Sequence, residues 1–140
     1  MKNILKQAFV CSVLAFASLP IVASAGPMPV LSGSFITAAH ATSGTATIYK
    51  YSNGQELLRL SNFSTSNGPK VHVVLVDHLI TGNNVMDRGS IDLGDLKGTN
   101  GNQNYTIPVG TDLSKVKAVS IYCERFHVNF GAAVLRKHAK

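Results

Sequence analysis

The stretch SIYCERFHVNFG, residues 120–131, changes the phase of its apolar side chains halfway along. Apolar side chains fall on odd positions up to Cys123 and on even positions after it. Because the side chains of a β-strand alternate between its faces, one regular strand cannot point both sets inward. A β-bulge at Glu124 or Arg125 would restore the register, and bulges are common beside functional sites. The pattern therefore predicts one strand over residues 117–130, with Cys123 on its core face beside a kink that leaves the thiol partly reactive.

Residues 1–25 match the pattern of a secretory signal peptide. A positively charged start precedes a short apolar run over residues 8–19, and Ala23 and Ala25 supply the small-x-small pattern of a cleavage site. The apolar run is shorter than the ~20 residues that span a bilayer, and no later stretch approaches that length. We therefore expect cleavage after Ala25 and a mature chain without a transmembrane segment, exported to the periplasm or secreted.

Cys123 would then be the one cysteine of the mature protein, because Cys11 lies in the apolar run that cleavage removes. Disulfides are the usual use of cysteine outside the cytosol, and they need pairs. An odd cysteine indicates an intermolecular bridge, a reactive thiol, a ligand or an inert buried side chain. The sequence leaves these four alternatives open.

The rest of the chain has the pattern of many short strands. An Asn53-Gly54 pair between β-rich residues 44–51 and 55–63 predicts a hairpin. Residues 71–77 are apolar on both faces, which is typical of a covered central strand. We further expect short strands at residues 90–93, 105–108 and 132–136, polar loops at 64–69, 81–89 and 100–104, and a helical turn at 112–116. The whole predicts an all-β fold, an antiparallel β-sandwich or barrel-like module of about 7–10 short strands.

The charge pattern excludes some functions. The formal net charge is +6, but the lysines and arginines are dispersed apart from a basic tail at residues 137–140. A nucleic-acid surface would need a clustered basic patch with a motif or stacking aromatics, so we expect no nucleic-acid partner. The Gly-x-Ser-x-Gly motif of many hydrolases is absent from the sequence, so hydrolytic catalysis has little support. Whether the protein is an enzyme stays open from the sequence.

Many short fragments of the chain occur in the order of one known family. The chain resembles the DM13 domain, also called the electron-transfer DM13 domain. The matching fragments are Gly33-Ser34-Phe35, residues 40–46, Ile48-Tyr49, residues 58–60, Asn62-Phe63, residues 65–69 (TSNGP), 73–75, Leu93-Gly94, residues 96–98, 101–105, Ile107-Pro108, residues 112–115 and 121–123, and Phe126, Val128 and Phe130-Gly131.

The resemblance implies a β-sandwich-like module over residues 32–136 and a redox role centred on the family cysteine, which falls on Cys123. Members of the family are described as acting through a bare thiol or through a bound group such as haem. One position departs from the family, because Lys70 stands where an acidic residue often follows Asn-Gly-Pro. We also expect the domain to stand alone here, whereas in the family it often accompanies larger redox domains.

Histidines are the candidate partners of the thiol. A thiolate with two imidazoles is the pattern of copper electron-transfer sites, and His40, His72 and His127 are the candidate co-ligands or supporting residues. The alternation of His72 with Val74 favours a packed histidine over a ligand. Covalent haem is excluded because Cys-x-x-Cys-His is absent, whereas haem or copper held through Cys123, or no cofactor at all, stay open.

Two functions remain in competition. The leading hypothesis is an exported redox or electron-transfer protein that uses Cys123 with a redox partner protein or a membrane-associated electron-transfer protein. The alternative is a non-catalytic binding module in which Cys123 is a buried structural residue and loops such as residues 100–104 contact the partner.

Overall fold

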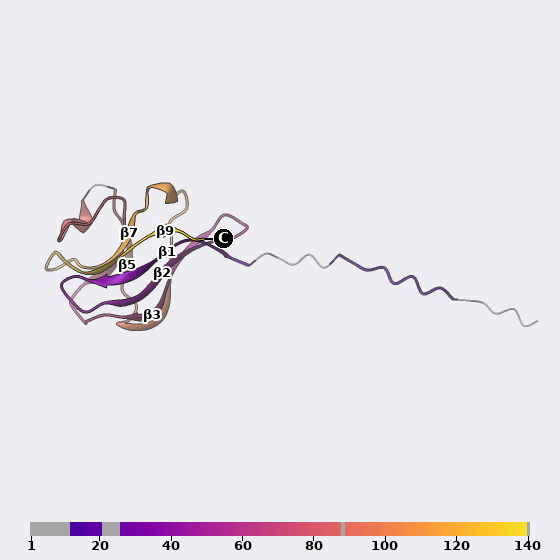
Figure 1. Ribbon diagram of the computed structural model, residues 1–140, viewed down its shortest axis with the longest axis horizontal. Helices are drawn as coiled ribbons and strands as arrows, with labels where there is room; N and C mark the ends of the chain where they lie inside the picture. Colours follow the sequence, from indigo (N-terminus) through magenta and orange to yellow (C-terminus); the bar gives the residue numbers. More distant parts are fainter. Residues whose placement is uncertain (1–11, 21–25, 88, 140) are drawn as a thin grey trace, which may run out of the picture.

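Nine strands and two short 3₁₀ helices form the secondary structure of the described residues, 12–20, 26–87 and 89–139, of the computed structural model (Figure 1). The elements are β1 (Met28–Thr37), β2 (Ser43–Lys50), β3 (Glu56–Ser64), β4 (Val71–Val76), η1 (Asn84–Met86), β5 (Ile91–Asp95), β6 (Asn100–Thr106), η2 (Leu113–Lys115), β7 (Ala118–Cys123), β8 (Val128–Val134) and β9 (Arg136–Lys137). No helix in these ranges is long and apolar enough to cross a membrane. The predicted all-β class is confirmed.

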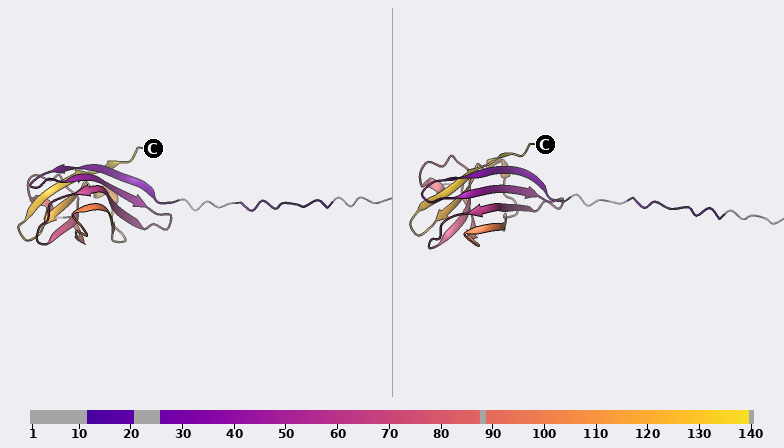
Figure 2. Two further views of the ribbon diagram at one scale, coloured as in Figure 1. Left: turned by 90° about the horizontal axis from the view of Figure 1, so that it is seen from below. Right: turned by 60° about the horizontal axis from the view of Figure 1, so that its bottom comes forward.

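The strands form one antiparallel sheet that curves into a nearly closed barrel (Figure 2). Its order is β5-β4-β7-β8-β1-β2-β3-β6, with β9 paired to β1. The seam between the edge strands β5 and β6 is bridged by side chains instead of a strand ladder. The hydroxyl of Tyr105 accepts the N–H of Lys97 at 2.8 Å and donates to Gln103 at 2.6 Å. Burial raises the pKa of Tyr105, which keeps this hydroxyl a donor.

The barrel interior holds the main apolar core, and a second cluster covers the outside of β4 and β7. The inner residues of these strands, such as Val73 and Ile121, belong to the main core. Val74 and Tyr122 point outward and pack with Val85 from the segment that follows β4. This second layer explains why residues 71–77 are apolar on both faces, and the predicted covered strand is confirmed.

The predicted hairpin is present as β2 and β3. The last pair of its ladder is Lys50 with Glu56, so the loop spans residues 51–55 and Gly54 alone in it has a positive φ, +86°. The expected polar loop at residues 100–104 is wrong, because these residues form most of β6 and pair with β3. Alternate β6 side chains face solvent on this edge strand, which gives a strand the composition of a loop.

The predicted single strand over residues 117–130 is also wrong. β7 ends at Cys123, residues 124–127 form a turn, and β8 returns antiparallel with Val128 paired to Cys123. Paired residues of antiparallel strands face the same side, so a core face passes from odd to even positions across this turn. No bulge occurs at Glu124 or Arg125. The register instead shifts farther along the β7–β8 ladder, between Ile121 and Tyr122.

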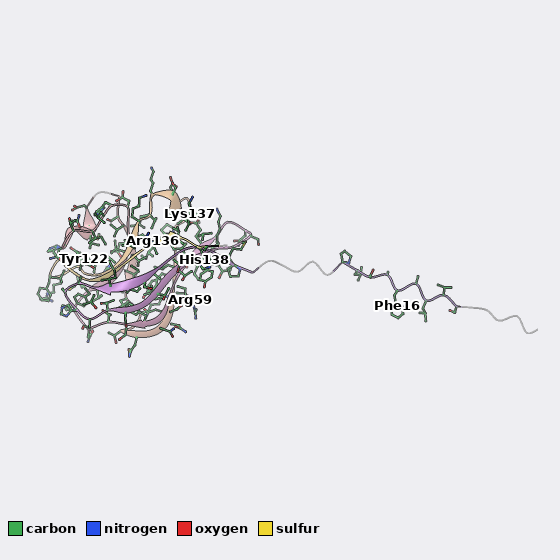
Figure 3. All side chains as sticks on the ribbon, viewed as in Figure 1. Phe16, Arg59, Tyr122, Arg136, Lys137 and His138 are labelled. Atoms are coloured by element: carbon green, nitrogen blue, oxygen red, sulfur yellow. The ribbon has the colours of Figure 1, made fainter. Side chains whose placement is uncertain are left out.

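The described ranges include residues near both ends of the chain. Residues 12–20 form no helix or strand and expose apolar side chains such as Phe16 (Figure 3). The predicted cleavage residues Ala23 and Ala25 lie outside the described ranges. At the other terminus, Lys137 of the predicted basic tail belongs to β9 and pairs with Leu31. The long strand β1 was not predicted from the sequence.

Strand registers give the barrel two ends. At one end Cys123 pairs with Val128 and Val71, and we call this the thiol end. The loops at this end are residues 38–42, 65–70 and 124–127. At the opposite end β1 and β2 pair through Met28 and Lys50, and we call this the pocket end.

Candidate functional site

The thiol of Cys123 lies inside the barrel at the thiol end. Cys123 is the last residue of β7 and is 1% exposed. Its Sγ donates a hydrogen bond to the carbonyl oxygen of Pro69 at 3.1 Å. Val71 and Val128, its neighbours on β4 and β8, pack in or against the same core cluster. The thiol is therefore held at the rim of the core, under the backbone of the segment that leads into β4.

Residues 65–70, which we call the covering loop, are fixed at both ends by hydrogen bonds. Thr65 donates its N–H to the carbonyl of Thr99 at 2.8 Å, and its hydroxyl lies 2.9 Å from that of Thr42. At the other end, the carbonyl of Lys70 accepts the N–H of Glu124 at 2.9 Å. The covering loop thus connects three separate segments above the thiol.

The covering loop also fits closely on the core. A Cβ at Gly68 would lie 2.9 Å from Cζ of Phe130, so glycine permits the close approach. Asn67 accepts the N–H of Gly68 at 2.9 Å and shapes the bend. Lys70 has a φ of +50°, in the left-handed region that residues other than Gly, Asn and Asp rarely adopt. A strained residue and a close glycine contact both accompany the closure over Cys123.

The turn after Cys123 points its histidine away from the thiol. His127 has a φ of +54°, and its Nδ1 lies 3.1 Å from the hydroxyl of Tyr122. Tyr122 is on the outer face of β7, because neighbouring residues of a strand alternate. Burial, and then the nearby charges of Cys123 and Glu124, raise the pKa of Tyr122. His127 therefore contacts the second, outer cluster and not the core face.

His40 lies at the thiol end but interacts with an aromatic ring. Its ring centroid is 4.2 Å from that of Phe130, with the planes tilted by 59°. Its backbone N–H donates to the carbonyl of Phe130 at 3.2 Å. His40 thus covers the residue on which the covering loop rests.

His72 is on the outer face of β4 and is surrounded by carboxylates. Its Nδ1 lies 2.7 Å from Asp92, and its Nε2 lies 3.1 Å from Asp95 and 3.3 Å from Glu124. It pairs in register with Tyr122, so it points away from the barrel interior. Both ring nitrogens have acidic partners, and neither faces the thiol.

The three histidines therefore surround the thiol end without converging on Cys123. Within the described ranges, no group of three or more His, Cys, Asp and Glu side chains is arranged to hold a metal ion. Copper would need the thiolate and imidazoles on one centre, and the thiol and the His72 and His127 rings lie on opposite faces of the sheet. Haem would need an open coordination face, whereas Cys123 is packed among Val71, Val128 and Pro69. The residues present do not fit either group.

A barrel-like antiparallel β domain with one buried thiol at a strand end is the class that fold and site define. Residues 34–135 match the family model described as Electron transfer DM13, and the chain belongs to this family. Membership in an electron-transfer family indicates a redox-related role. Searches of curated proteins and of solved structures found no match to the chain.

Sequence reasoning found Cys123 and missed what holds it. Pro69 contributes a backbone carbonyl, which no side-chain pattern reveals. The fragment at residues 65–69 is part of the family resemblance and was the one signal for this loop, but nothing in the sequence connects it with a cysteine 54 positions away.

Proposed function

We propose that the protein is an exported member of the DM13 family whose redox-active group is the thiol of Cys123. The observation that carries the proposal is the position of the Cys123 Sγ under the covering loop, where it donates a hydrogen bond to the carbonyl oxygen of Pro69. Loops open at a lower free-energy cost than strands of a sheet, so this thiol can become exposed without unfolding of the barrel. The covering loop would then decide when the thiol reacts.

The chemistry that suits a single thiol is exchange with the disulfide of a redox partner protein or a membrane-associated electron-transfer protein. The thiolate is the nucleophile, and the thiol proton leaves to solvent. It attacks one sulfur of the partner disulfide, forms a mixed disulfide and releases the other sulfur as a thiolate. The sulfur of Cys123 is oxidised in this step and the released sulfur is reduced. In the reverse step, the released thiolate attacks the partner sulfur of the mixed disulfide, which restores the partner disulfide and frees Cys123 as a thiolate.

The sequence pattern of an exported protein supports the same function. Residues 1–25 have the pattern of a signal peptide, and disulfide-bearing partners are common in oxidising compartments such as the periplasm. Cleavage after Ala25 would leave Gly26 as the first residue. Mass spectrometry of the protein recovered from a periplasmic extract should show this amino terminus, and an intact chain found only in the cytosol would contradict export.

A thiol-labelling experiment tests the proposed opening. Native protein is labelled with iodoacetamide over a series of low guanidinium concentrations, with Cys123→Ser as the blank. We expect a labelling rate that hardly changes with denaturant, because opening of a loop exposes little surface. A rate that rises with the slope of global unfolding would mean that the thiol is reached only in the unfolded chain, and the proposal would be wrong.

Two glycines provide a matched pair for the covering loop. In Gly68→Ala the new methyl group would press on Phe130, whereas in Gly98→Ala the nearest atom outside its neighbours lies at 3.6 Å. Overpacking of this kind costs about 1–3 kcal/mol. We expect Gly68→Ala to label about tenfold faster than the parent, since 1.4 kcal/mol corresponds to a factor of ten. Gly98→Ala should label at the parental rate.

A second candidate function rests on the burial of the thiol. A cysteine that is 1% exposed and hydrogen-bonded to a backbone carbonyl also suits a binding module in which the thiol is packing. The two functions differ in the phenotype of Cys123→Ser. A folded variant that no longer forms mixed disulfides in cells supports the redox function, whereas unchanged behaviour of a folded variant supports the binding module.

A further inference from the structure

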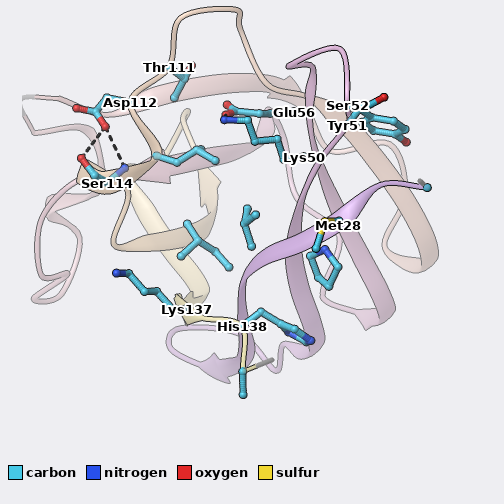
Figure 4. Close-up of a pocket in the computed structure, with 16 residues that line it drawn as sticks. Met28, Lys50, Tyr51, Ser52, Glu56, Thr111, Asp112, Ser114, Lys137 and His138 are labelled. Atoms are coloured by element: carbon cyan, nitrogen blue, oxygen red, sulfur yellow. Dashed lines mark hydrogen bonds and ion pairs between the residues drawn. The ribbon is translucent and has the colours of Figure 1, made fainter. Parts of the chain in front are cut away.

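The pocket end of the barrel carries a large cavity that the proposed thiol chemistry does not use (Figure 4). Its volume is about 1090 Å³. It is open to solvent and is lined by the start of β1, the β2–β3 hairpin, residues 111–114 and residues 137–139. Cavities that hold small organic molecules have volumes of ~300–1,000 Å³ and mostly apolar walls. The cavity therefore has the size of a small-molecule site, at the end of the barrel opposite to Cys123.

The floor of this cavity is apolar. Val30, Leu31 and Leu113 line it and also pack against the main core. Met28 lies at the rim and is 64% exposed. Contact with these side chains would remove apolar surface from water, which stabilises a bound ligand by ~25 cal/mol per Å² of surface buried.

One ion pair gives the wall a polar spot. Nζ of Lys50 and Oε1 of Glu56 lie 4.0 Å apart, too far for a hydrogen bond. The side chain of Glu56 is only 12% exposed, whereas that of Lys50 is 55% exposed. A third group between them can thus form hydrogen bonds with both, one donated by the ammonium of Lys50 and one accepted by the carboxylate of Glu56. Figure 4 shows the two side chains together on one wall.

The lysine and carboxylate side chains of the wall balance one another in charge. Two lysines, Lys50 and Lys137, face two carboxylates, Glu56 and Asp112, around the cavity. Asp112 is engaged by Ser114, whose hydroxyl and N–H donate to Oδ1 at 2.6 and 3.0 Å. An ionic head group would lose hydration here and find one attractive and one repulsive partner in the Lys50–Glu56 pair. A neutral head that both accepts and donates hydrogen bonds complements the pair.

We propose that this cavity binds a neutral amphipathic small molecule. Its apolar body would rest on Val30, Leu31 and Leu113. Its head, an amide or hydroxyl group, would accept a hydrogen bond from Lys50 and donate one to Glu56. This site is separate from the thiol end and functions whether or not Cys123 is redox-active.

The probe for the experiment is Nile red, a neutral dye whose fluorescence rises in apolar surroundings. Purified protein is loaded with the dye, which is then displaced by four ten-carbon amphiphiles: decanamide, 1-decanol, decanoate and decylammonium. We expect the two neutral compounds to displace the dye at concentrations about tenfold lower than either ion. Decanoate also tests the amino group that cleavage would create at Gly26, which lines the cavity.

Matched variants locate the binding. Met28→Glu places a charge at the rim, whereas Ile36→Glu changes an equally exposed residue of the same strand outside the cavity, 69% exposed against 64%. We expect Met28→Glu to weaken binding of decanamide about tenfold and Ile36→Glu to leave it unchanged. Lys50→Met should weaken decanamide about fivefold, and Lys115→Met, on the nearby helix η2, should have no effect.

Three results would overturn the proposal. One is the absence of saturable dye binding to folded protein. Another is stronger displacement by an ion than by the neutral compounds. The third is a concentration-dependent dimer, seen by sedimentation velocity, that Met28→Glu dissociates, because a second copy would then be the occupant of the cavity.

Discussion

At the thiol end, loops fold over the core and are joined by backbone and hydroxyl hydrogen bonds, whereas at the pocket end the core meets solvent through a cavity. The covering loop is connected to Thr99, Thr42 and Glu124 by hydrogen bonds. Around the cavity, the hairpin, helix η2 and strand β9 stand apart and leave Val30 and Leu31 partly exposed. One continuous core therefore ends in two different ways.

The difference shows how one barrel could keep the two proposed sites apart. A reactive thiol needs protection from adventitious oxidation, which close packing provides. A ligand site needs apolar surface that is still exposed to solvent, and the open pocket end of the barrel provides such surface. Because each end is built by its own loops, a change at one end should leave the other intact. The following predictions test this independence.

The largest effect is expected at Gly131, where the thiol end depends on close backbone approach. A Cβ at this position would lie 2.5 Å from Cβ of Thr42 and 2.9 Å from the carbonyl oxygen of Ile36. Gly131→Ala must displace Thr42, whose hydroxyl contacts that of Thr65 in the covering loop. We expect the free energy of unfolding to fall by about 2–3 kcal/mol, measured by guanidinium denaturation.

Dye binding in the same variant tests whether the two ends are independent. At concentrations of denaturant where Gly131→Ala is still folded, Nile red should bind as tightly as to the parent, while Cys123 should label faster. Equal labelling of variant and parent would show that Thr42 does not support the covering loop, and lost dye binding would show that the ends are coupled.

A smaller effect is expected from serine at one residue of each end. Cys123→Ser places a more polar group in the core, next to Pro69, and should cost about 1–2 kcal/mol of unfolding free energy. Met28→Ser changes a residue that is mostly in water and should cost less than about 0.5 kcal/mol. Thermal and guanidinium unfolding of both variants measure the contrast, and equal losses would contradict the difference in packing.

Much of the fold could be predicted from the sequence because local patterns determine it. The Asn53-Gly54 turn, the two-sided apolar run at residues 71–77 and the short helix near residue 113 are all present. β6 could not be predicted, because an edge strand with exposed polar side chains has the composition of a loop. β1 was not predicted because its side chains are mostly half-buried and show no clear alternation of buried and exposed positions.

The candidate site was predicted only in part. The core-facing position of Cys123 followed from the alternation of residues 119–123, and the structure buries it. The change of phase after it has two physical causes that a sequence does not separate, a bulge in one strand or a turn between two. The structure has the turn, so the kink that was expected to open the thiol is absent and the covering loop encloses it. That loop depends on a carbonyl from residue 69, which only the tertiary structure brings close.

The smallest effect is expected at the pocket end, from the titration of Asp112. Hydrogen bonds from the hydroxyl and N–H of Ser114 lower the pKa of Asp112 below its usual value of 3.8. A lowered pKa in the folded state means that the stabilisation is complete above the unfolded pKa and is lost as the pH falls through the folded pKa. The start of helix η2 should therefore loosen in acid, while the thiol end stays closed.

Amide hydrogen exchange measures this loosening at Ser114, whose N–H is held by Asp112. After correction for intrinsic rates, protection of this amide should fall as the pH is lowered below about 4, whereas the amide of Glu124, held by Lys70, should keep its protection. Asp112→Asn retains an acceptor for the N–H but cannot titrate, so its Ser114 protection should be independent of pH in this range. Loss of protection at Ser114 and Glu124 together would mean that acid unfolds the whole barrel and that its two ends do not respond separately.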